Sequence, residues 1–189
     1  MQNKKLLNMV LLALFSALIF LMGQTPLGLI PLGFCNVTLL VIPVAVGTIY
    51  MGWKNGLVLG AAFAATSLVS AFIKPSTLVG TLMGASPLLT IVMTVLPRLC
   101  IPLVIAGMFR LLSGKQKHVA AAVAAACGSV TNTVLYLGLM LLFYVLCGID
   151  NTAVLTTIGA VAGGAGPLEA LAAAVITPPI LMALWRTKK

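Results

Sequence analysis

The stretch SPLLTIVMTVLPRLCIPLVIAGMFRLL, residues 86–112, decides what kind of protein this chain forms. A helix of this length rises about 40 Å at about 1.5 Å per residue. That is longer than the hydrocarbon core of a bilayer, which is about 30 Å thick. Arg98 interrupts the apolar run near its middle. The stretch therefore predicts a transmembrane helix, tilted or protruding, with a positive charge inside the membrane.

The composition of the whole chain agrees with this interpretation. The 189 residues are 61% hydrophobic and 7% charged, and the mean hydropathy is +1.20. Soluble domains are about 45–50% apolar and about 25% charged, so the values exclude a soluble globular protein and a disordered chain. Eleven Lys and Arg residues face two acids. Because the basic residues lie between apolar runs, they indicate orientation in a membrane and contact with lipid rather than binding of nucleic acid.

Further apolar segments suggest how often the chain crosses the membrane. With residues 86–112 they make six candidate spans, and the other five cover residues 6–23, 37–53, 57–73, 119–147 and 167–185. None alternates polar and apolar residues as the strands of a membrane barrel do. We therefore expect an all-α, integral membrane six-transmembrane-helix bundle, with residues 1–189 forming a single substrate-binding domain.

The distribution of basic residues predicts the orientation of the bundle. With six spans, nine of the eleven lie on the side of both termini, while Lys74, Asp150 and Glu169 lie on the other. The positive-inside rule then places both termini in the cytoplasm. No small-x-small cleavage site follows residues 6–23, so we expect a retained helix rather than a signal peptide.

The connections are expected to differ between the two sides. Residues 54–56 predict a tight inner turn, whereas the outer segments 24–36, 74–85 and 148–166 are longer and include Gly- and Pro-rich stretches. We expect these three to be loops, either lids over a cavity mouth or plain connectors.

Arg98 is the most informative candidate for a functional site. A charge inside the membrane costs several kcal/mol unless it is paired or hydrated, so such a residue suggests function. No acid is expected at a matching depth on another span. Arg98 would then bind an anionic ligand, gripping a carboxylate with two hydrogen bonds. The alternatives are that it bonds helix-end carbonyls or meets Glu169 after tilting.

Several other polar residues are candidates for the same site. Asn132 falls at about the depth of Arg98 and needs hydrogen-bonding partners, from a ligand or from another helix. Tyr136 lies one turn outward on the same face and would stack on a ligand or fill the bundle. Glu169 suits the first turn of a helix by its charge alone. Lys74 would anchor at the interface or attract an anion.

Other features narrow the function class. Ala13 and Ala17 share a helix face, where small residues allow a second helix to approach closely. The chain has no nucleotide-binding P-loop, no H-E-x-x-H and no G-x-S-x-G, and one histidine among scattered cysteines offers almost no metal ligands. We therefore expect no enzyme activity, no metal and no cofactor.

The order of several short motifs resembles the substrate-binding S components of energy-coupling factor (ECF) vitamin transporters. They are TPLGLIPLG at 25–33, NVTLLVIP at 36–43, GxxxG at 52–56, LPR at 96–98, GSVTNT at 128–133, GPLEA at 166–170 and ITPP at 176–179. The resemblance covers nearly the whole chain. It implies a bacterial cell-membrane protein that binds a vitamin or its precursor on the outer side, under loops that include Asn36.

The resemblance also implies partners and a substrate. Such proteins dock through a small-residue motif, matched by Ala13 and Ala17, on a transmembrane coupling subunit driven by two ATPases, and are thought to topple to release substrate inside. The pattern looks most like S components assigned to pantothenate, whose carboxylate would meet Arg98 and whose hydroxyls and amide would meet Asn132. Riboflavin, folate and pyridoxine-type substrates stay open. So do two functions from other classes, a self-sufficient ion-coupled carrier and a structural membrane protein.

Overall fold

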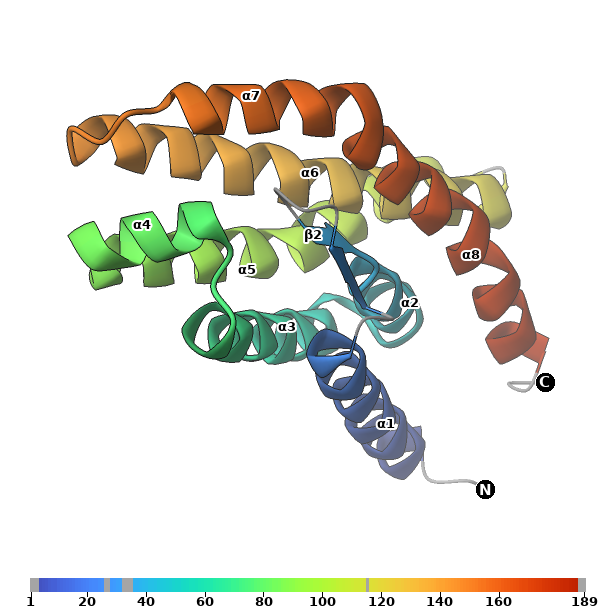
Figure 1. Ribbon diagram of the computed structural model, residues 1–189. Coiled ribbons are helices and arrows are strands. Elements are labelled where there is room, and N and C mark those ends of the chain that lie inside the picture. Colours follow the sequence, from blue (N-terminus) through green and yellow to red (C-terminus); the bar gives the residue numbers. More distant parts are fainter. Residues whose placement is uncertain (1–3, 26–27, 32–35, 115, 187–189) are drawn as a thin grey trace.

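The computed structural model describes residues 4–25, 28–31, 36–114 and 116–186, and in these residues the chain is a helical bundle with one short hairpin (Figure 1). Five helical stretches of the described chain are apolar and long enough to cross a membrane. They are α1 (Lys4–Gln24), α3 (Trp53–Ile73), α5 (Pro87–Leu112), α6 (Lys117–Leu146), and the continuous run of α7 (Thr152–Ala160), the π-helical turn η1 (Val161–Ala165) and α8 (Gly166–Arg186).

The expected span over residues 37–53 is shorter than predicted. Its first residues belong to strand β2 (Asn36–Thr38), which pairs antiparallel with β1 (Leu29–Pro31), and helix α2 covers only Val41–Met51. Eleven residues rise about 16 Å, about half of a bilayer core. Every residue of α2 from Val41 to Thr48 is buried. The apolar run reflects burial inside the protein as much as contact with lipid.

Two of the expected outer loops are helices instead. Residues 74–85 contain α4 (Thr77–Ala85), and residues 148–166 contain α7 and η1. Helix α4 forms because Leu78, Val79 and Leu82 share one face, which packs on Met93 of α5 and Phe143 of α6. The glycines and small residues that predicted loops are helical here because tertiary packing outweighs weak local propensity.

Two connections show how local chemistry sets the helix boundaries. The expected turn at residues 54–56 lies inside the first turn of α3, and the chain reverses at Gly52, whose φ of 93° suits glycine. Before α7, the carboxylate of Asp150 accepts hydrogen bonds from the backbone N–H and the hydroxyl of Thr152. These hydrogen bonds hold the pKa of Asp150 below its ordinary value.

Helix α5 packs against both α3 and α6. It contains Pro97 and Pro102, which cannot donate to the carbonyls of Met93 and Arg98. A Cβ atom on Gly60 of α3 would lie only 2.7 Å from the carbonyl oxygen of Arg98. Glycine therefore allows α3 to pack directly against the backbone of α5 at Arg98.

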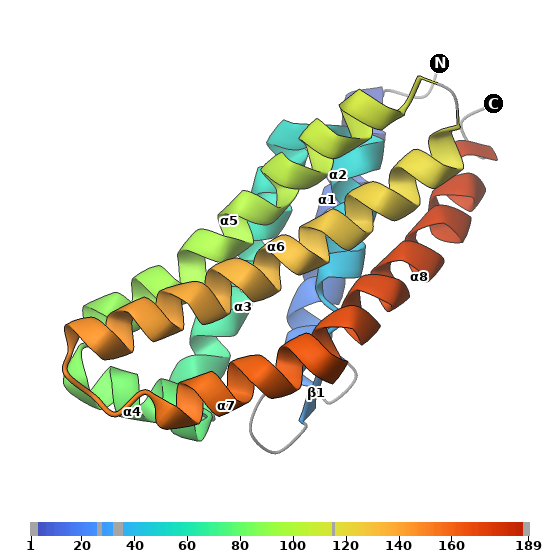
Figure 2. The ribbon, with the colours of Figure 1, turned by 90° about the horizontal axis from the view of Figure 1, so that it is seen from above.

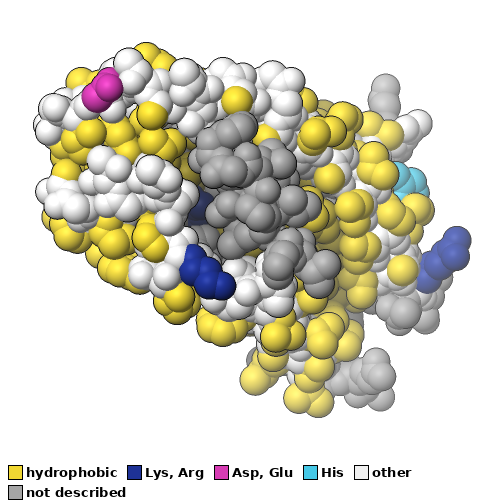
Figure 3. Space-filling model, viewed as in Figure 1, with side chains coloured by type: hydrophobic (Ala, Val, Ile, Leu, Met, Phe, Trp, Pro, Cys, Tyr) yellow, Lys and Arg dark blue, Asp and Glu magenta, His cyan; other side chains and the backbone are white. Residues whose placement is uncertain are grey.

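The two ends of the bundle differ. Figure 2 shows both termini at one end, beside the α5–α6 connection, whereas α4, α7 and the hairpin lie at the opposite end, called here the hairpin end. Helix α2 returns the chain from the hairpin end to the termini. Large hydrophobic side chains are exposed along α1, α5, α6 and α8. Hydrophobic side chains form extensive patches on the described surface seen in Figure 3. Such a surface suits lipid rather than water.

Candidate functional site

A cavity of about 130 Å³ lies in the hairpin half of the bundle. It has room for on the order of ten water molecules, which suits a small organic molecule. Its walls come from β2 and from every helix between α3 and α8. The lining residues are Thr38, Ser67, Ser70, Ala71, Lys74, Ser76, Leu78, Val79, Thr94, Arg98, Asn132, Thr133, Tyr136, Leu137, Met140, Thr157, Val161, Ala165 and Glu169.

The guanidinium group of Arg98 is held beside this cavity by aromatic rings. It lies 4.5 Å from the ring centroid of Tyr136 on α6 and 5.4 Å from that of Phe63 on α3. Rings at these distances stabilise a cation. The side chain is 7% exposed, and its Nε and Nη1 have no hydrogen-bond partner among the described residues. Arg98 is thus a buried cation with unsatisfied hydrogen-bond donors.

Asn132 provides a second unsatisfied polar group at the same cavity. Its side chain is 5% exposed, and its Oδ1 accepts no hydrogen bond from any described residue. Asn132 lies on α6 one turn before Tyr136, the ring that packs on Arg98. The structure therefore brings together the three residues Arg98, Asn132 and Tyr136 that the sequence singled out.

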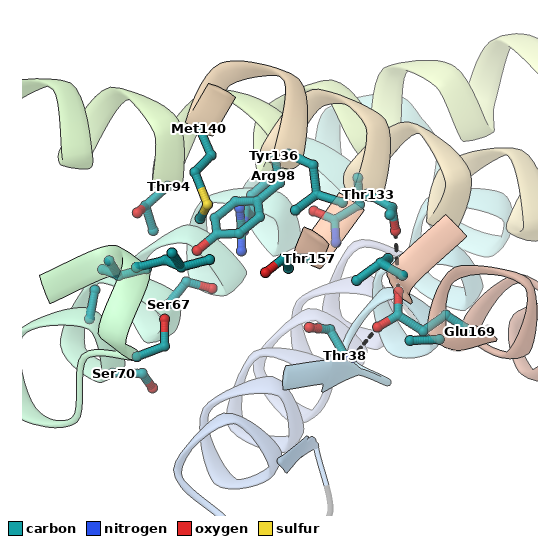
Figure 4. Close-up of a pocket in the computed structure, with 18 of the residues that line it drawn as sticks. Thr38, Ser67, Ser70, Thr94, Arg98, Thr133, Tyr136, Met140, Thr157 and Glu169 are labelled. Atoms are coloured by element: carbon teal, nitrogen blue, oxygen red, sulfur yellow. Dashed lines mark hydrogen bonds between the residues drawn. The ribbon is translucent and has the colours of Figure 1, made fainter. Parts of the chain in front are cut away.

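Glu169 also lines the cavity, so an acid that the sequence did not place at the depth of Arg98 shares the cavity with it. The first turn of α8 lies inside the hairpin half because α7 and η1 precede it as helix. One carboxylate oxygen accepts the backbone N–H of Thr38, and the other lies 3.3 Å from Oγ1 of Thr133. Within the described part of the chain, no ion pair joins Glu169 to Arg98. Figure 4 shows Glu169 beside Thr38 and Thr133, apart from Arg98 and Tyr136.

The other candidate residues are placed as follows. Lys74 is exposed and lines the cavity after the end of α3. Asn36 belongs to β2, but its side chain lies outside the described part of the structure. Ala13 and Ala17 are exposed on α1, and neither residue lines the cavity. Both alanines are therefore accessible on the bundle surface.

Several lining residues were not predicted from the sequence. Ser67 and Ser70 of α3, Thr94 of α5 and Thr157 of α7 contribute hydroxyl groups to the cavity. Isolated Ser and Thr residues in apolar helices usually bond the preceding turn of the same helix. That these four hydroxyl groups share one cavity becomes visible only when the three helices are brought together.

The comparisons with known proteins agree with this architecture. A family model described as "ECF transporter, substrate-specific component" matches residues 7–184, nearly the full length of the chain. No curated protein gives a sequence match to the chain. Proteins of the matched family bind a transported substrate and are not enzymes. With its apolar membrane-length helices and its cavity lined by Arg98, this chain belongs to the family of substrate-specific S components of ECF transporters.

Proposed function

We propose that this S component captures a vitamin or vitamin precursor that carries one carboxylate, with pantothenate as the best candidate. The observation that supports this most is the guanidinium of Arg98. A buried cation without hydrogen-bond partners is costly, and a carboxylate satisfies both its charge and its donors. The unsatisfied Oδ1 of Asn132 would accept a hydrogen bond from a hydroxyl or amide N–H of the same ligand.

The size and composition of the cavity favour a small, flexible ligand over a large flat one. Tyr136 is the one aromatic side chain among its described lining residues, and its ring already packs on Arg98. A flavin or pterin ring gains much of its binding energy from stacking on aromatic surfaces. Seven Ser and Thr residues line the cavity instead, which suits a ligand with several hydrogen-bonding groups. In this proposal Arg98, Asn132, Tyr136, Lys74, Glu169 and Asn36 form the binding site.

We further propose that delivery depends on partner proteins. The loaded chain would dock through the face of α1 that carries Ala13 and Ala17, both exposed, on a transmembrane coupling subunit that works with two ATPases. The setting would be the bacterial cell membrane, with both termini in the cytoplasm and the hairpin end facing outward. The residues of the whole chain would act as one domain.

The test of substrate binding is a thermal-shift and calorimetric panel on the purified full chain in detergent. The panel contains pantothenate, riboflavin, folate, pyridoxine, thiamine and biotin. A ligand at 100 times its dissociation constant should stabilise the protein by about 2.7 kcal/mol. We expect pantothenate to give the largest shift. If no compound shifts the transition, the proposal of vitamin capture is wrong.

The test of delivery is uptake in proteoliposomes. We expect transport only when the coupling subunit and the ATPases are present with ATP. Gradient-driven uptake by the chain alone would instead identify a self-sufficient ion-coupled carrier. Ligand binding without any uptake in the complete complex would contradict the delivery step while leaving the binding step intact.

A further inference from the structure

We infer that the cavity requires an uncharged hydrogen-bond donor at the end of the ligand opposite its carboxylate, and that it excludes a second negative charge there. This inference rests on the proposed function and goes further, because it predicts which chemical forms of a vitamin are rejected. It follows from how donors and acceptors are distributed around the cavity.

Arg98 supplies the buried positive charge of the wall. Its Nε and Nη1 lack hydrogen-bond partners among the described residues, and Tyr136 and Phe63 hold the guanidinium from both α6 and α3. The only other cation of the described lining is Lys74, which is exposed. An anion therefore finds a buried, desolvated partner at one position only, beside Arg98.

Four hydroxyl groups of the remaining wall can only accept hydrogen bonds, because their protons are already in use. Thr94 and Thr157 donate to the carbonyls of Thr90 and Ala153, at 2.8 Å in each case, and Ser70 donates to the carbonyl of Gly23 at 3.3 Å. A hydroxyl has one proton and two lone pairs. Once that proton is donated to a carbonyl, the oxygen can only accept from a ligand.

Thr133 is committed in the same way. Its Oγ1 lies 3.3 Å from the carbonyl of Ser129 and 3.3 Å from a carboxylate oxygen of Glu169, so its proton serves one of these two acceptors. The unsatisfied Oδ1 of Asn132 adds another acceptor. Of the seven Ser and Thr residues that line the cavity, four thus have no proton left for a ligand.

Glu169 gives this acceptor wall a negative charge. Its carboxylate is 7% exposed and sits apart from Arg98, beside Thr38 and Thr133 (Figure 4). Because a carboxylate can accept about four hydrogen bonds, the two protein donors leave it capacity for a ligand hydroxyl or N–H. A second anion at this position is repelled by the carboxylate of Glu169 and faces hydroxyl oxygens that have no proton to donate to it. Like charges at such a site cost several kcal/mol, which corresponds to about 100-fold or more in affinity.

The experiment compares pantothenate with 4′-phosphopantothenate, which keeps the carboxylate but carries a phosphate on the hydroxyl at the opposite end. Binding of each is measured by calorimetry on the purified full chain. We expect the phosphate ester to bind at least about 100-fold more weakly than pantothenate. Equal affinity of the two compounds would overturn the inference.

The variant Glu169→Gln tests whether Glu169 is the residue that weakens binding of the phosphate ester. The amide oxygen still accepts the N–H of Thr38, so the hairpin contact is kept while the charge is removed. We expect the ratio between the two affinities to fall by about 10-fold or more, with pantothenate affinity less affected. Asp150→Asn is the matched control, because Asp150 is the other acid of the chain and lies outside the cavity. An unchanged ratio in Glu169→Gln, or an equal change in Asp150→Asn, would contradict the assignment.

The outcomes separate this inference from the proposed substrate. If pantothenate does not bind, its place is taken by the alcohol-bearing compound of the panel (riboflavin, pyridoxine or thiamine) that gives the largest shift, together with its own phosphate ester. A parent compound that binds much more tightly than its ester supports the inference although the substrate was wrongly identified. An ester that binds as well as its parent overturns the inference although substrate capture stands. Absence of binding by every compound overturns both.

Discussion

Arg98 of α5 and Glu169 of α8 line one cavity without forming an ion pair. Glu169 accepts hydrogen bonds from β2 and α6, and the guanidinium of Arg98 packs on two aromatic rings with donors unsatisfied. Had the two side chains formed an ion pair, the charge on Arg98 would be explained by structure alone. The separation leaves a buried cation and a buried carboxylate at different places on the wall, which together define a ligand with two unlike ends.

Replacing Arg98 by methionine should separate folding from binding. Removing an uncompensated buried charge should leave the melting temperature of the ligand-free protein unchanged or raise it. Losing one partner of a buried charge pair costs about 2–5 kcal/mol, so affinity for an anionic vitamin should fall by about 30-fold or more. Arg110→Met is the control, because Arg110 is exposed in the last turn of the same helix. Unchanged affinity in calorimetry would remove Arg98 from the site.

Gly60→Ala should disturb the site by displacing the backbone of α5 at Arg98. The added Cβ would lie 2.7 Å from the carbonyl oxygen of Arg98 and 3.2 Å from Cγ of Pro102, so α3 and α5 must move apart. Overpacking of this kind costs about 1–3 kcal/mol, and the shift of Arg98 should also weaken ligand binding. Gly107→Ala on α5 has no heavy atom within 4 Å of the new Cβ and should be neutral or stabilising. Equal melting temperatures for both variants would contradict the close approach.

Tyr144→Phe should loosen α4 over the cavity. The hydroxyl of Tyr144 donates to the carbonyl of Leu78 at 2.6 Å, and this bond joins α6 to α4. Its loss removes a buried hydrogen bond, while the carbonyl of Leu78 keeps its bond within α4, and should cost about 0.5–1.5 kcal/mol. Hydrogen exchange of residues 77–85 should accelerate more than exchange in α1. Equal protection in the native protein and the variant would show that the apolar face of α4 alone holds it in place.

Bulky substitutions on α1 should block transport and spare binding. Ala13→Trp and Ala17→Trp place an indole on an exposed small-residue face, where it would keep another helix from approaching closely. We expect uptake in proteoliposomes with the coupling module to fall to background, with vitamin affinity unchanged. Val175→Trp on α8, where the native side chain is 69% exposed, is the control for a surface indole. Normal uptake in both alanine variants would refute the proposed docking face.

Much of the site was predictable because charge inside a membrane is rare. Arg98 interrupts an apolar run, and the helical rise per residue predicts Asn132 at about the same depth. Both residues line the cavity. The hydroxyls of Ser67, Thr94 and Thr157 gave no such signal, since each lies on a different helix and its spacing carries no pattern. Glu169 was recognised as a first-turn acid, but its place in the same cavity as Arg98 depended on how α7 and η1 fold.

The amino-acid sequence alone determined the membrane character of the protein, its helical class and the burial of one guanidinium, because these follow from the composition of continuous segments. The tertiary structure decided that residues 37–53 form a strand and a short buried helix, and that two glycine-containing connections are helical. It also decided that Glu169 bonds to β2 and α6 instead of Arg98. These outcomes depend on contacts between residues far apart in the chain, whose packing energies outweigh local propensity and leave no period in the sequence.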